Sequence, residues 1–181
     1  MTENSLISQC RQLDGKAQRM LFDTYANLML PICIRYLNDT HEAEDAMLSG
    51  FEKFFRNINR FEYRGDGSIR AFLKKIMVNE CLMSLRQTKR LGVFDEVDTN
   101  DLASDIDILS GLSAKEIFKL ISELPDDYRT VLNLFEVERY THEQIAFELN
   151  VTVGTSKSQL SKAKALLRKR LQQTNSDYAK R

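Results

Sequence analysis

The sequence predicts an all-α protein made of two small helical domains joined by an acidic linker, with a helix-turn-helix in the second domain. Its 181 residues include only two prolines and seven glycines, so few residues interrupt helices. Apolar residues recur at intervals of three and four, whereas the strict alternation typical of strands is scarce. The sign of the local charge also changes twice along the chain, which indicates separate modules.

The charged residues balance overall, with 26 basic and 26 acidic side chains, but they are unevenly distributed. Residues 53–90 contain ten Lys or Arg against three acids, residues 91–114 contain six acids and no Lys or Arg, and residues 151–181 contain eight Lys or Arg against one acid. Two basic blocks around an acidic one favour two nucleic-acid-binding modules. We therefore expect domains at 1–91 and 112–181, with a poorly ordered acidic linker at 92–111.

In the first domain, helical spacing of apolar residues predicts helices separated by short polar stops. Pro31 should kink the second helix, because proline lacks an amide hydrogen and crowds the preceding turn. Phe72 is expected on the buried face of the last helix, and a loop with two glycines, FEYRGDGS, precedes that helix. The expected helices span residues 4–12, 16–37, 41–57 and 69–90, with the loop at 61–68.

In the second domain, we expect helices at 113–123 and 126–138, followed by a helix-turn-helix and a frayed tail from 172. Thr141 and Gln144 form a capping-box pattern for the first motif helix, and Asn150 is a plausible stop. The second motif helix buries Leu160, Ala163 and Leu167.

The second motif helix has a cationic, hydroxyl-rich face that suits the major groove of DNA. Lysine can donate to guanine O6 and N7, and hydroxyl groups can bind bases or phosphates. The alternative is a surface helix pair whose lysines are only solvated. The residues expected to face the groove are Thr155, Lys157, Ser158, Ser161 and Lys162, and Lys164 also lies on the polar part of the helix.

Other classes of protein are disfavoured. Cys10, Cys33 and Cys81 are widely spaced, and neither His41 nor His142 has a neighbouring ligand, so no metal site is expected. There is no phosphate-binding glycine motif or nucleophile constellation, so we expect no cofactor and no enzyme activity. Because the start lacks a signal-peptide pattern and no apolar run is long enough for a membrane span, a soluble cytoplasmic protein is expected.

Residues 123–167, ELPDDYRTVLNLFEVERYTHEQIAFELNVTVGTSKSQLSKAKALL, resemble the fourth conserved region of the extracytoplasmic-function (ECF) sigma factors. The first domain resembles the second conserved region of the same family, in the aromatic helix 41–57 and in the Arg-Gly-Asp-Gly-Ser run of the loop. The likeness covers about residues 16–172. Departures from the family pattern are Leu48, Ser49, Phe72 and Met83.

The resemblance implies a sigma factor that binds core RNA polymerase and directs transcription from specific promoters, with the chemistry left to the polymerase. The groove-facing residues would contact the upstream promoter element, and the acidic linker would thread the nucleic-acid cleft of the polymerase. Many relatives are also controlled by an anti-sigma factor. The alternative is a stand-alone helix-turn-helix regulator whose first domain binds a ligand or a second copy of itself.

Two further sets of residues are expected to act in the first domain. Opening DNA requires stacking surfaces and cations along the strand, although Phe61 could instead belong to the core. Docking on the polymerase requires an amphipathic helix with apolar and acidic side chains. The residues expected for the downstream element and melting are Phe61, Tyr63, Arg64, Lys74, Lys75, Asn79 and Arg86, and those for polymerase binding are Asp45, Leu48, Glu52 and Phe55.

Overall fold

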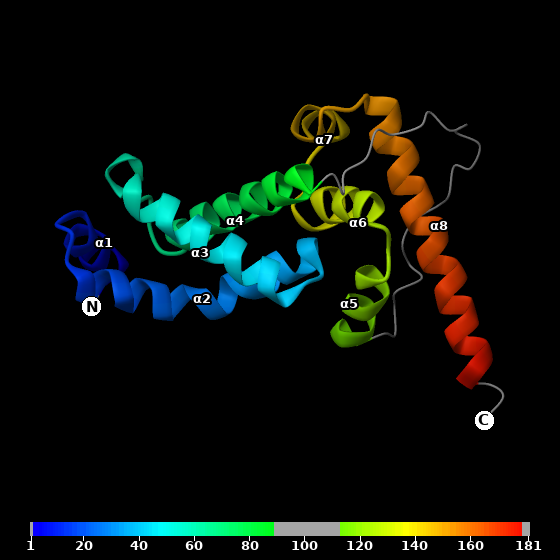
Figure 1. The fold of residues 1–181 in the computed structure, drawn as a ribbon, viewed down its shortest axis with the longest axis horizontal. Coiled ribbons are helices and arrows are strands. Elements are labelled where there is room, and N and C mark those ends of the chain that lie inside the picture. The colour runs from blue at the N-terminus through cyan, green and yellow to red at the C-terminus, as the bar shows by residue number, and fades with distance from the viewer. Residues whose placement is uncertain (1, 89–112, 179–181) are drawn as a thin grey trace. The chain divides into compact units, whose positions relative to one another are not determined.

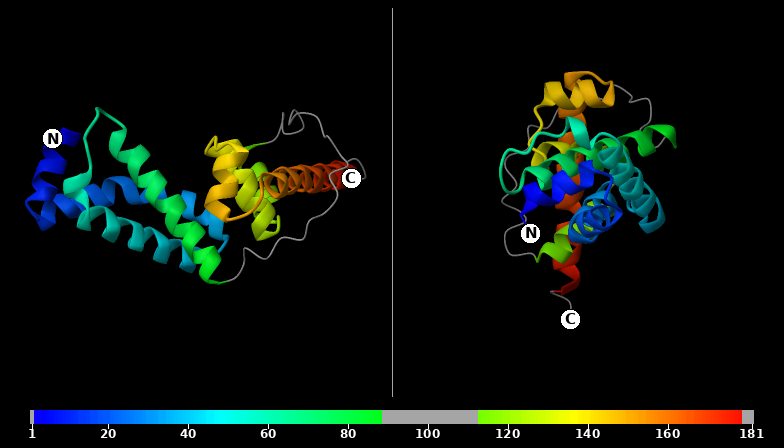
Figure 2. Two further views of the ribbon diagram at one scale, coloured as in Figure 1. Left: turned by 90° about the horizontal axis from the view of Figure 1, so that it is seen from above. Right: turned by 90° about the vertical axis from the view of Figure 1, so that its left-hand side faces the viewer.

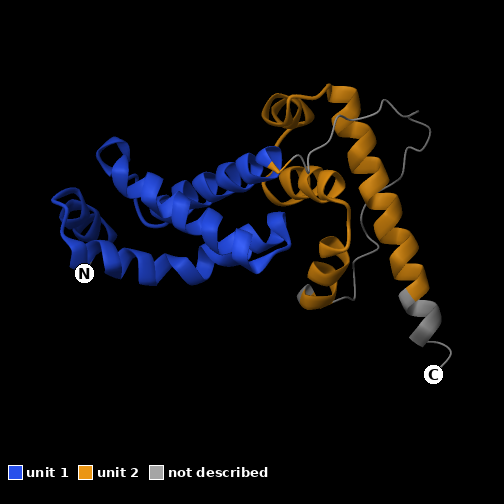
Figure 3. Ribbon diagram, viewed as in Figure 1, with its two compact units in different colours: residues 1–87 blue, residues 88–181 orange. Residues whose placement is uncertain are grey.

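The computed structural model describes residues 2–88 and 113–178, and within these ranges every regular element is a helix. This confirms the predicted all-α class. The chain forms two compact units, Met1–Gln87 and Thr88–Arg181 (Figure 3). The expected linker at 92–111, together with Lys89 and Arg90, lies outside the described residues.

Unit 1 is a helical bundle. Figures 1 and 2 show α2 (Gly15–Leu37), α3 (Thr40–Arg56) and α4 (Ser68–Gln87) packed together, with α1 (Glu3–Arg11) against α2. A short 3₁₀ turn, Ile58–Arg60, leads out of α3. Helices α2 and α3 begin at side-chain caps, since Asp14 accepts from the amides of Lys16 and Ala17, and Asp39 accepts from that of Glu42.

Two features set the packing of the unit 1 bundle. Helix α2 continues across Pro31, which does not end it. Gly50 brings α3 close to α4, because a Cβ at this position would lie 2.6 Å from the sulfur of Met77. The close approach lets α3 and α4 exchange the polar contacts described below.

Unit 2 contains α5 (Ala114–Ser122), α6 (Asp126–Leu132) with a π-helical continuation at Asn133–Val137, α7 (His142–Leu149) and α8 (Val153–Tyr178). Helix α8 contacts each of the other three helices. Arg129 is buried in this unit, where it donates to the carbonyl oxygen of Leu124 at 2.7 Å and pairs with Asp126. A charge is tolerated there because it is hydrogen-bonded and paired.

The expectation of a frayed tail from residue 172 was wrong, because α8 continues to Tyr178. Leu171 is buried and extends the series Leu160, Ala163 and Leu167 by one more helical step. This extra apolar contact keeps the backbone helical into the segment that had been expected to fray.

Candidate nucleic-acid interface

The turn of the helix-turn-helix is fixed by side-chain caps. The Thr141 hydroxyl accepts from the Gln144 amide at 3.2 Å, and the Gln144 side-chain oxygen accepts from the Thr141 amide at 2.8 Å. Asn150 ends α7 in the left-handed conformation with φ of 54°. Thr152 then accepts from the Thr155 amide at 3.0 Å at the start of α8. These contacts fix where α7 begins and ends and where α8 begins.

The α8 residues expected to face DNA lie on its accessible side. Lys157 is exposed, and Lys162 is half-buried. The residues between them that point inward, Ser156 and Gln159, are buried with Leu160 and Ala163. The hydroxyl of Thr155 is already bonded to that of Thr152 at 2.8 Å. The remaining expected positions, Ser158 and Ser161, are half-buried beside the lysines.

The sequence placed Lys164 on the cationic polar face, but the structure uses it inside unit 2. Its ammonium group lies 3.0 Å from Glu136 and 5.8 Å from the ring centroid of Phe135, and only 18% of its side chain is exposed. The spacing was informative, because Lys164 is one turn beyond Leu160 and next to Ala163 in the buried series. Its charge therefore belongs to the packing of α8 on the α6 segment.

His142 is a second residue whose place the sequence did not reveal. Its Nδ1 lies 2.9 Å from the hydroxyl oxygen of the buried Ser156, and its ring stacks on Phe135 at 4.6 Å between centroids. Burial lowers the pKa of the imidazole, and the positive charge of Lys157 lowers it further, with Glu143 opposing and Lys164 adding to the shift. The neutral ring therefore ties the start of α7 to the start of α8.

The loop 61–67 of unit 1 is shaped by its own polar groups. The Tyr63 hydroxyl donates to Asp66 at 2.7 Å, and Arg64 pairs with Glu62 at 3.0 Å. Gly65 and Gly67 have φ of 105° and 85°, a region that residues with a Cβ adopt only with strain. The hydrogen bond to Asp66 raises the pKa of Tyr63 to about 12.

The burial of the two aromatic rings beside this loop is the reverse of what the sequence favoured. Phe61 is 4% exposed and packs against Phe54 and Phe72, with centroids 5.9 and 5.0 Å away. Phe72, expected in the core, is 39% exposed. Phe72 lies in the first turn and a half of α4, at the edge of the aromatic cluster, so only part of its ring is covered.

The polar residues expected on α4 divide between two directions. Phe72, Lys75, Asn79 and Arg86 follow one another at intervals of three, four and seven, so they share one helical face, and the three polar ones are exposed. Arg86 also donates to the carbonyl oxygen of Leu82 at 3.1 Å. Lys74 is half-buried and projects about 100° away from Lys75 around the helix. This face meets the loop at Phe72, whose ring lies 5.0 Å from that of Phe61 between centroids.

The residues expected to bind polymerase also share a face, on α3. Asp45, Leu48, Glu52 and Phe55 recur at intervals of three and four. Leu48 is 52% exposed, so its side chain is accessible to a partner. Glu52 is exposed and pairs with Arg56 on the same helix, and Phe55 is half-buried against Phe51 at 6.2 Å.

Comparison with known proteins identifies both units. The family model described as "Sigma-70 region 2" matches residues 21–91, and "Sigma-70, region 4" matches residues 109–167, in that order along the chain. The chain belongs to the sigma-70 family of sigma factors. The match of unit 1 to region 2 leaves the alternative of a stand-alone regulator without support.

Full-length relatives place this sigma factor in the ECF type. It is 26% identical to the ECF RNA polymerase sigma-E factor of Haemophilus influenzae, covering 95% of this chain and 96% of that one. It is 27% identical to the RNA polymerase sigma-H factor of Pseudomonas aeruginosa, covering 94% of each. The ECF sigma factor SigW of Bacillus subtilis is 26% identical, over 91% of this chain and 94% of that one.

A solved structure has the same fold. It is the sigma factor RpoE in complex with the anti-sigma factor NepR from Bartonella quintana, with a TM-score of 0.51 and 21% identity over 85% of this chain and 96% of that one. In the described part of our sigma factor, no helix is long and apolar enough to cross a membrane. No three His, Cys, Asp or Glu side chains in those ranges are grouped as metal ligands would be.

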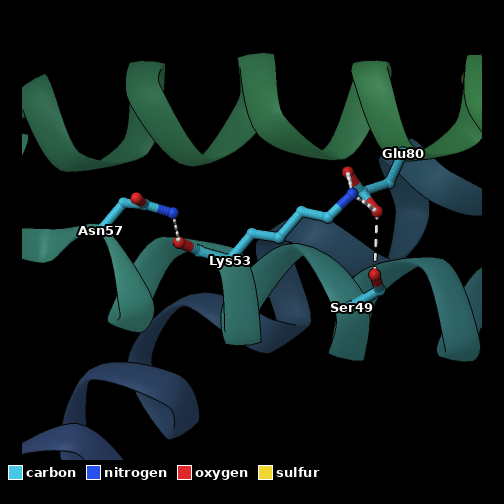
Figure 4. A network of polar contacts seen from close by, with 4 residues as sticks. All are labelled: Ser49, Lys53, Asn57 and Glu80. Atoms are coloured by element: carbon cyan, nitrogen blue, oxygen red, sulfur yellow. Dashed lines mark hydrogen bonds and ion pairs between the residues drawn. The ribbon is translucent and has the colours of Figure 1, made fainter.

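Within region 2 of this sigma factor, a polar network built on the buried Glu80 links α3 to α4 (Figure 4). The two carboxylate oxygens of Glu80 on α4 accept hydrogen bonds from the Lys53 ammonium group at 2.7 and 2.8 Å. The same carboxylate accepts from the Ser49 hydroxyl at 2.8 Å. The Asn57 side-chain amide donates to the backbone carbonyl oxygen of Lys53 at 2.9 Å. The carboxylate of Glu80 is almost fully buried. This explains one departure from the family pattern, because an acid in place of Ser49 would face Glu80.

Proposed function

We propose that the two units of this sigma factor divide promoter recognition between them while α3 docks on core RNA polymerase. The observation that carries the proposal is the order of the two family regions, each with an accessible polar face of the required chemistry. The protein then acts as a binding subunit in the cytoplasm, where transcription takes place, and the polymerase performs the chemistry.

Duplex reading is assigned to the start of α8. Lys157 and Lys162 can donate to guanine edges in the major groove, and the hydroxyls of Thr155, Ser158 and Ser161 can bind bases or phosphates. The capped turn between α7 and α8 supports this role, since a recognition helix must enter the groove at a fixed angle. The target of this surface is the upstream promoter element.

DNA opening is assigned to the loop 61–67 and the adjoining face of α4. Tyr63 and Arg64 can stack on or bond to an extruded base, and Lys75, Asn79 and Arg86 can follow the strand. The exposed edge of Phe72 adds a second aromatic surface. The buried Phe61 supports the loop from beneath in the free protein, and Lys74 flanks the strand path.

Polymerase docking is assigned to the α3 face of Asp45, Leu48, Glu52 and Phe55. An exposed leucine flanked by acids fits a partner groove with an apolar floor and a basic rim. The acidic linker would add a second attachment by mimicking a nucleic-acid strand in a basic channel. An anti-sigma factor that covers either surface would hold the protein inactive.

The first experiment is a pull-down of the full chain with bacterial core RNA polymerase, followed by run-off transcription on promoters selected by this holoenzyme from a randomised DNA library. Retention on the polymerase with transcripts from fixed start points is expected. A Leu48→Glu variant should lose retention, and an Asp23→Asn variant, which changes an exposed acid on α2, should not. Sequence-specific duplex binding without retention on polymerase would contradict the proposal.

A further inference from the structure

The first helix of the chain contacts the C-terminal end of the loop 61–67, to which DNA opening is assigned. Glu3, in the first turn of α1, has a carboxylate with two partners on different segments. Its Oε1 accepts from the Tyr25 hydroxyl of α2 at 2.6 Å, and its Oε2 accepts from the backbone amide of Gly67 at 3.2 Å. One side chain thus connects α1, the bundle and the last residue of the loop.

The same helix also contacts the N-terminal end of the loop. Arg11, in the last turn of α1, donates to the carbonyl oxygen of Phe61 at 2.5 Å. Leu6, Ile7 and Cys10 are buried between these two contacts and seat α1 on the bundle. The two ends of α1 therefore contact the two ends of the loop 61–67.

The contacts from α1 differ in kind from those within the loop. Tyr63 with Asp66 and Arg64 with Glu62 give the loop its shape, but both pairs are internal to it. The bonds from Glu3 and Arg11 instead join the loop to a separate helix, and both involve a charged group, which strengthens a hydrogen bond. Burial and the bond to Glu3 raise the pKa of the Tyr25 hydroxyl, which keeps that group a donor.

We propose that Glu3 and Arg11 are positioning residues for promoter opening, which hold the loop 61–67 in the geometry that receives an unpaired base. The inference rests on the proposed role of the loop. Helix α1 lies before the residues that match region 2, which begin at 21, so nothing in that match assigns it a task. A loop ordered in advance loses less conformational freedom when a base binds, so a strand whose base fits the loop gains affinity. A scrambled strand that places no fitting base in the loop does not share this gain, and the ratio of the two affinities rises.

The test measures base discrimination by holoenzyme rather than stability. The probes are a 15-nucleotide single strand carrying the downstream element of a promoter selected by the wild-type holoenzyme, and a scrambled strand of the same composition. Glu3→Ala and Arg11→Ala should each lower the ratio of the two affinities about tenfold, the effect of losing one or two charge-assisted bonds. Glu3→Gln keeps one acceptor oxygen and should fall between Glu3→Ala and wild type.

Two controls separate positioning from general damage to the fold. Asn4→Ala changes an exposed side chain on the same helix and should leave the discrimination ratio unchanged. Retention on core polymerase and binding to the upstream duplex should be the same for all variants. An equal loss of affinity for both strands, or of polymerase binding, in Glu3→Gln would overturn the positioning role.

A parallel variant, Tyr63→Ala with Arg64→Ala, distinguishes the inference from the function on which it rests. Its opening of the selected promoter is followed by permanganate footprinting. If this variant loses opening and discrimination while Glu3→Ala and Arg11→Ala keep both, α1 has no positioning role and the loop assignment stands. If the loop variant itself behaves as wild type, the loop assignment fails, and the inference fails with it.

Discussion

Lys157 and Lys162 are the α8 cations expected to face DNA, whereas Lys164 pairs with Glu136 and lies over the ring of Phe135. The double variant Lys157→Ala with Lys162→Ala should weaken binding to the upstream duplex by about 2–6 kcal/mol, because each of two base contacts contributes roughly 1–3 kcal/mol. The salt dependence of binding should also become shallower if either lysine contacts a phosphate. Electrophoretic mobility shifts at several salt concentrations measure both effects.

A matched control for these lysines is Lys115→Ala with Lys119→Ala, which removes the same charge from exposed positions of α5. It should leave duplex binding within a few tenths of a kcal/mol of wild type. Polymerase binding should be unaffected in both double variants. Similar losses in the two would mean that net charge, rather than the face of α8, attracts the duplex.

His142 gives unit 2 a pH dependence whose sign follows from its environment. Burial and neighbouring lysines lower its pKa in the folded state, so the unfolded chain binds the proton more tightly. The neutral ring therefore contributes its full stabilisation above the ordinary histidine pKa of about 6.5, and this is lost as the pH falls toward and through the lower folded value. After correction for intrinsic exchange rates, hydrogen exchange of α7 and α8 amides should be faster at pH 5 than at pH 7.5.

Replacing His142 isolates this effect. His142→Gln carries no titrating group, so the acceleration of exchange at pH 5 relative to pH 7.5, after correction for intrinsic exchange rates, should shrink. His41→Gln, which changes an exposed histidine in the other unit, should retain the wild-type response in α7 and α8. An unchanged response in His142→Gln would show that another group titrates.

At the scale of elements, α3 and α4 are joined by a polar contact whose two partners differ in burial. The Glu80 side chain is 7% exposed, whereas that of Lys53 is 43% exposed. Glu80→Ala leaves Ser49 and Lys53 without their shared acceptor and should destabilise the α3–α4 contact by about 2–3 kcal/mol. Lys53→Ala should cost at least as much, because the buried Glu80 carboxylate then lacks its counter-ion, even though Ser49 still donates to it.

A double-mutant cycle over Lys53 and Glu80 measures the coupling, with amide hydrogen exchange in α3 and α4 as the readout. A coupling of about 1 kcal/mol or more is expected for a pair that is half shielded from water. If the two single losses simply add, the ion pair contributes nothing and Glu80 acts through Ser49 alone.

The helices were predictable because their signals are local. The Thr141 and Gln144 capping box and the series Leu160, Ala163 and Leu167 depend only on neighbours along the chain. The exposure of Phe72 could not be predicted, because it depends on where Phe54 and Phe61 lie in the folded unit. Glu3 contacts a residue 64 positions away in the sequence, and Glu80 contacts residues 27 and 31 positions away. A helical pattern of apolar residues does not predict pairs so far apart.

At the scale of the whole molecule, the sigma factor carries two DNA-binding units on one chain, so binding by one raises the local concentration of the other at its site. The segment between residues 88 and 113 limits how far apart the units can act. Fully extended, it spans about 85 Å, which corresponds to roughly 25 base pairs of B-DNA. The two promoter elements must lie within this reach plus the width of the units themselves.

The charge of the connecting segment should matter as much as its length. Its acids can attract the basic channel of the polymerase, and this attraction acts at a distance before contact. Neutralising them to Asn or Gln should slow association with core polymerase on the order of tenfold at low salt, and much less at high salt, where exposed charges are screened. Stopped-flow binding measures the rate, and the residues changed are Asp95, Glu96, Asp98, Asp101, Asp105 and Asp107.

A segment variant with unchanged charge separates electrostatics from sequence in this test. Thr99, Asn100, Ser104 and Ser110, all replaced by alanine, alter the same stretch without touching an acid. This variant should associate at the wild-type rate at every salt concentration. If it slows as much as the neutralised variant, or if the neutralised variant slows equally at high salt, the segment binds through specific side-chain contacts. Its acidity would then serve another purpose than guiding the sigma factor to the polymerase.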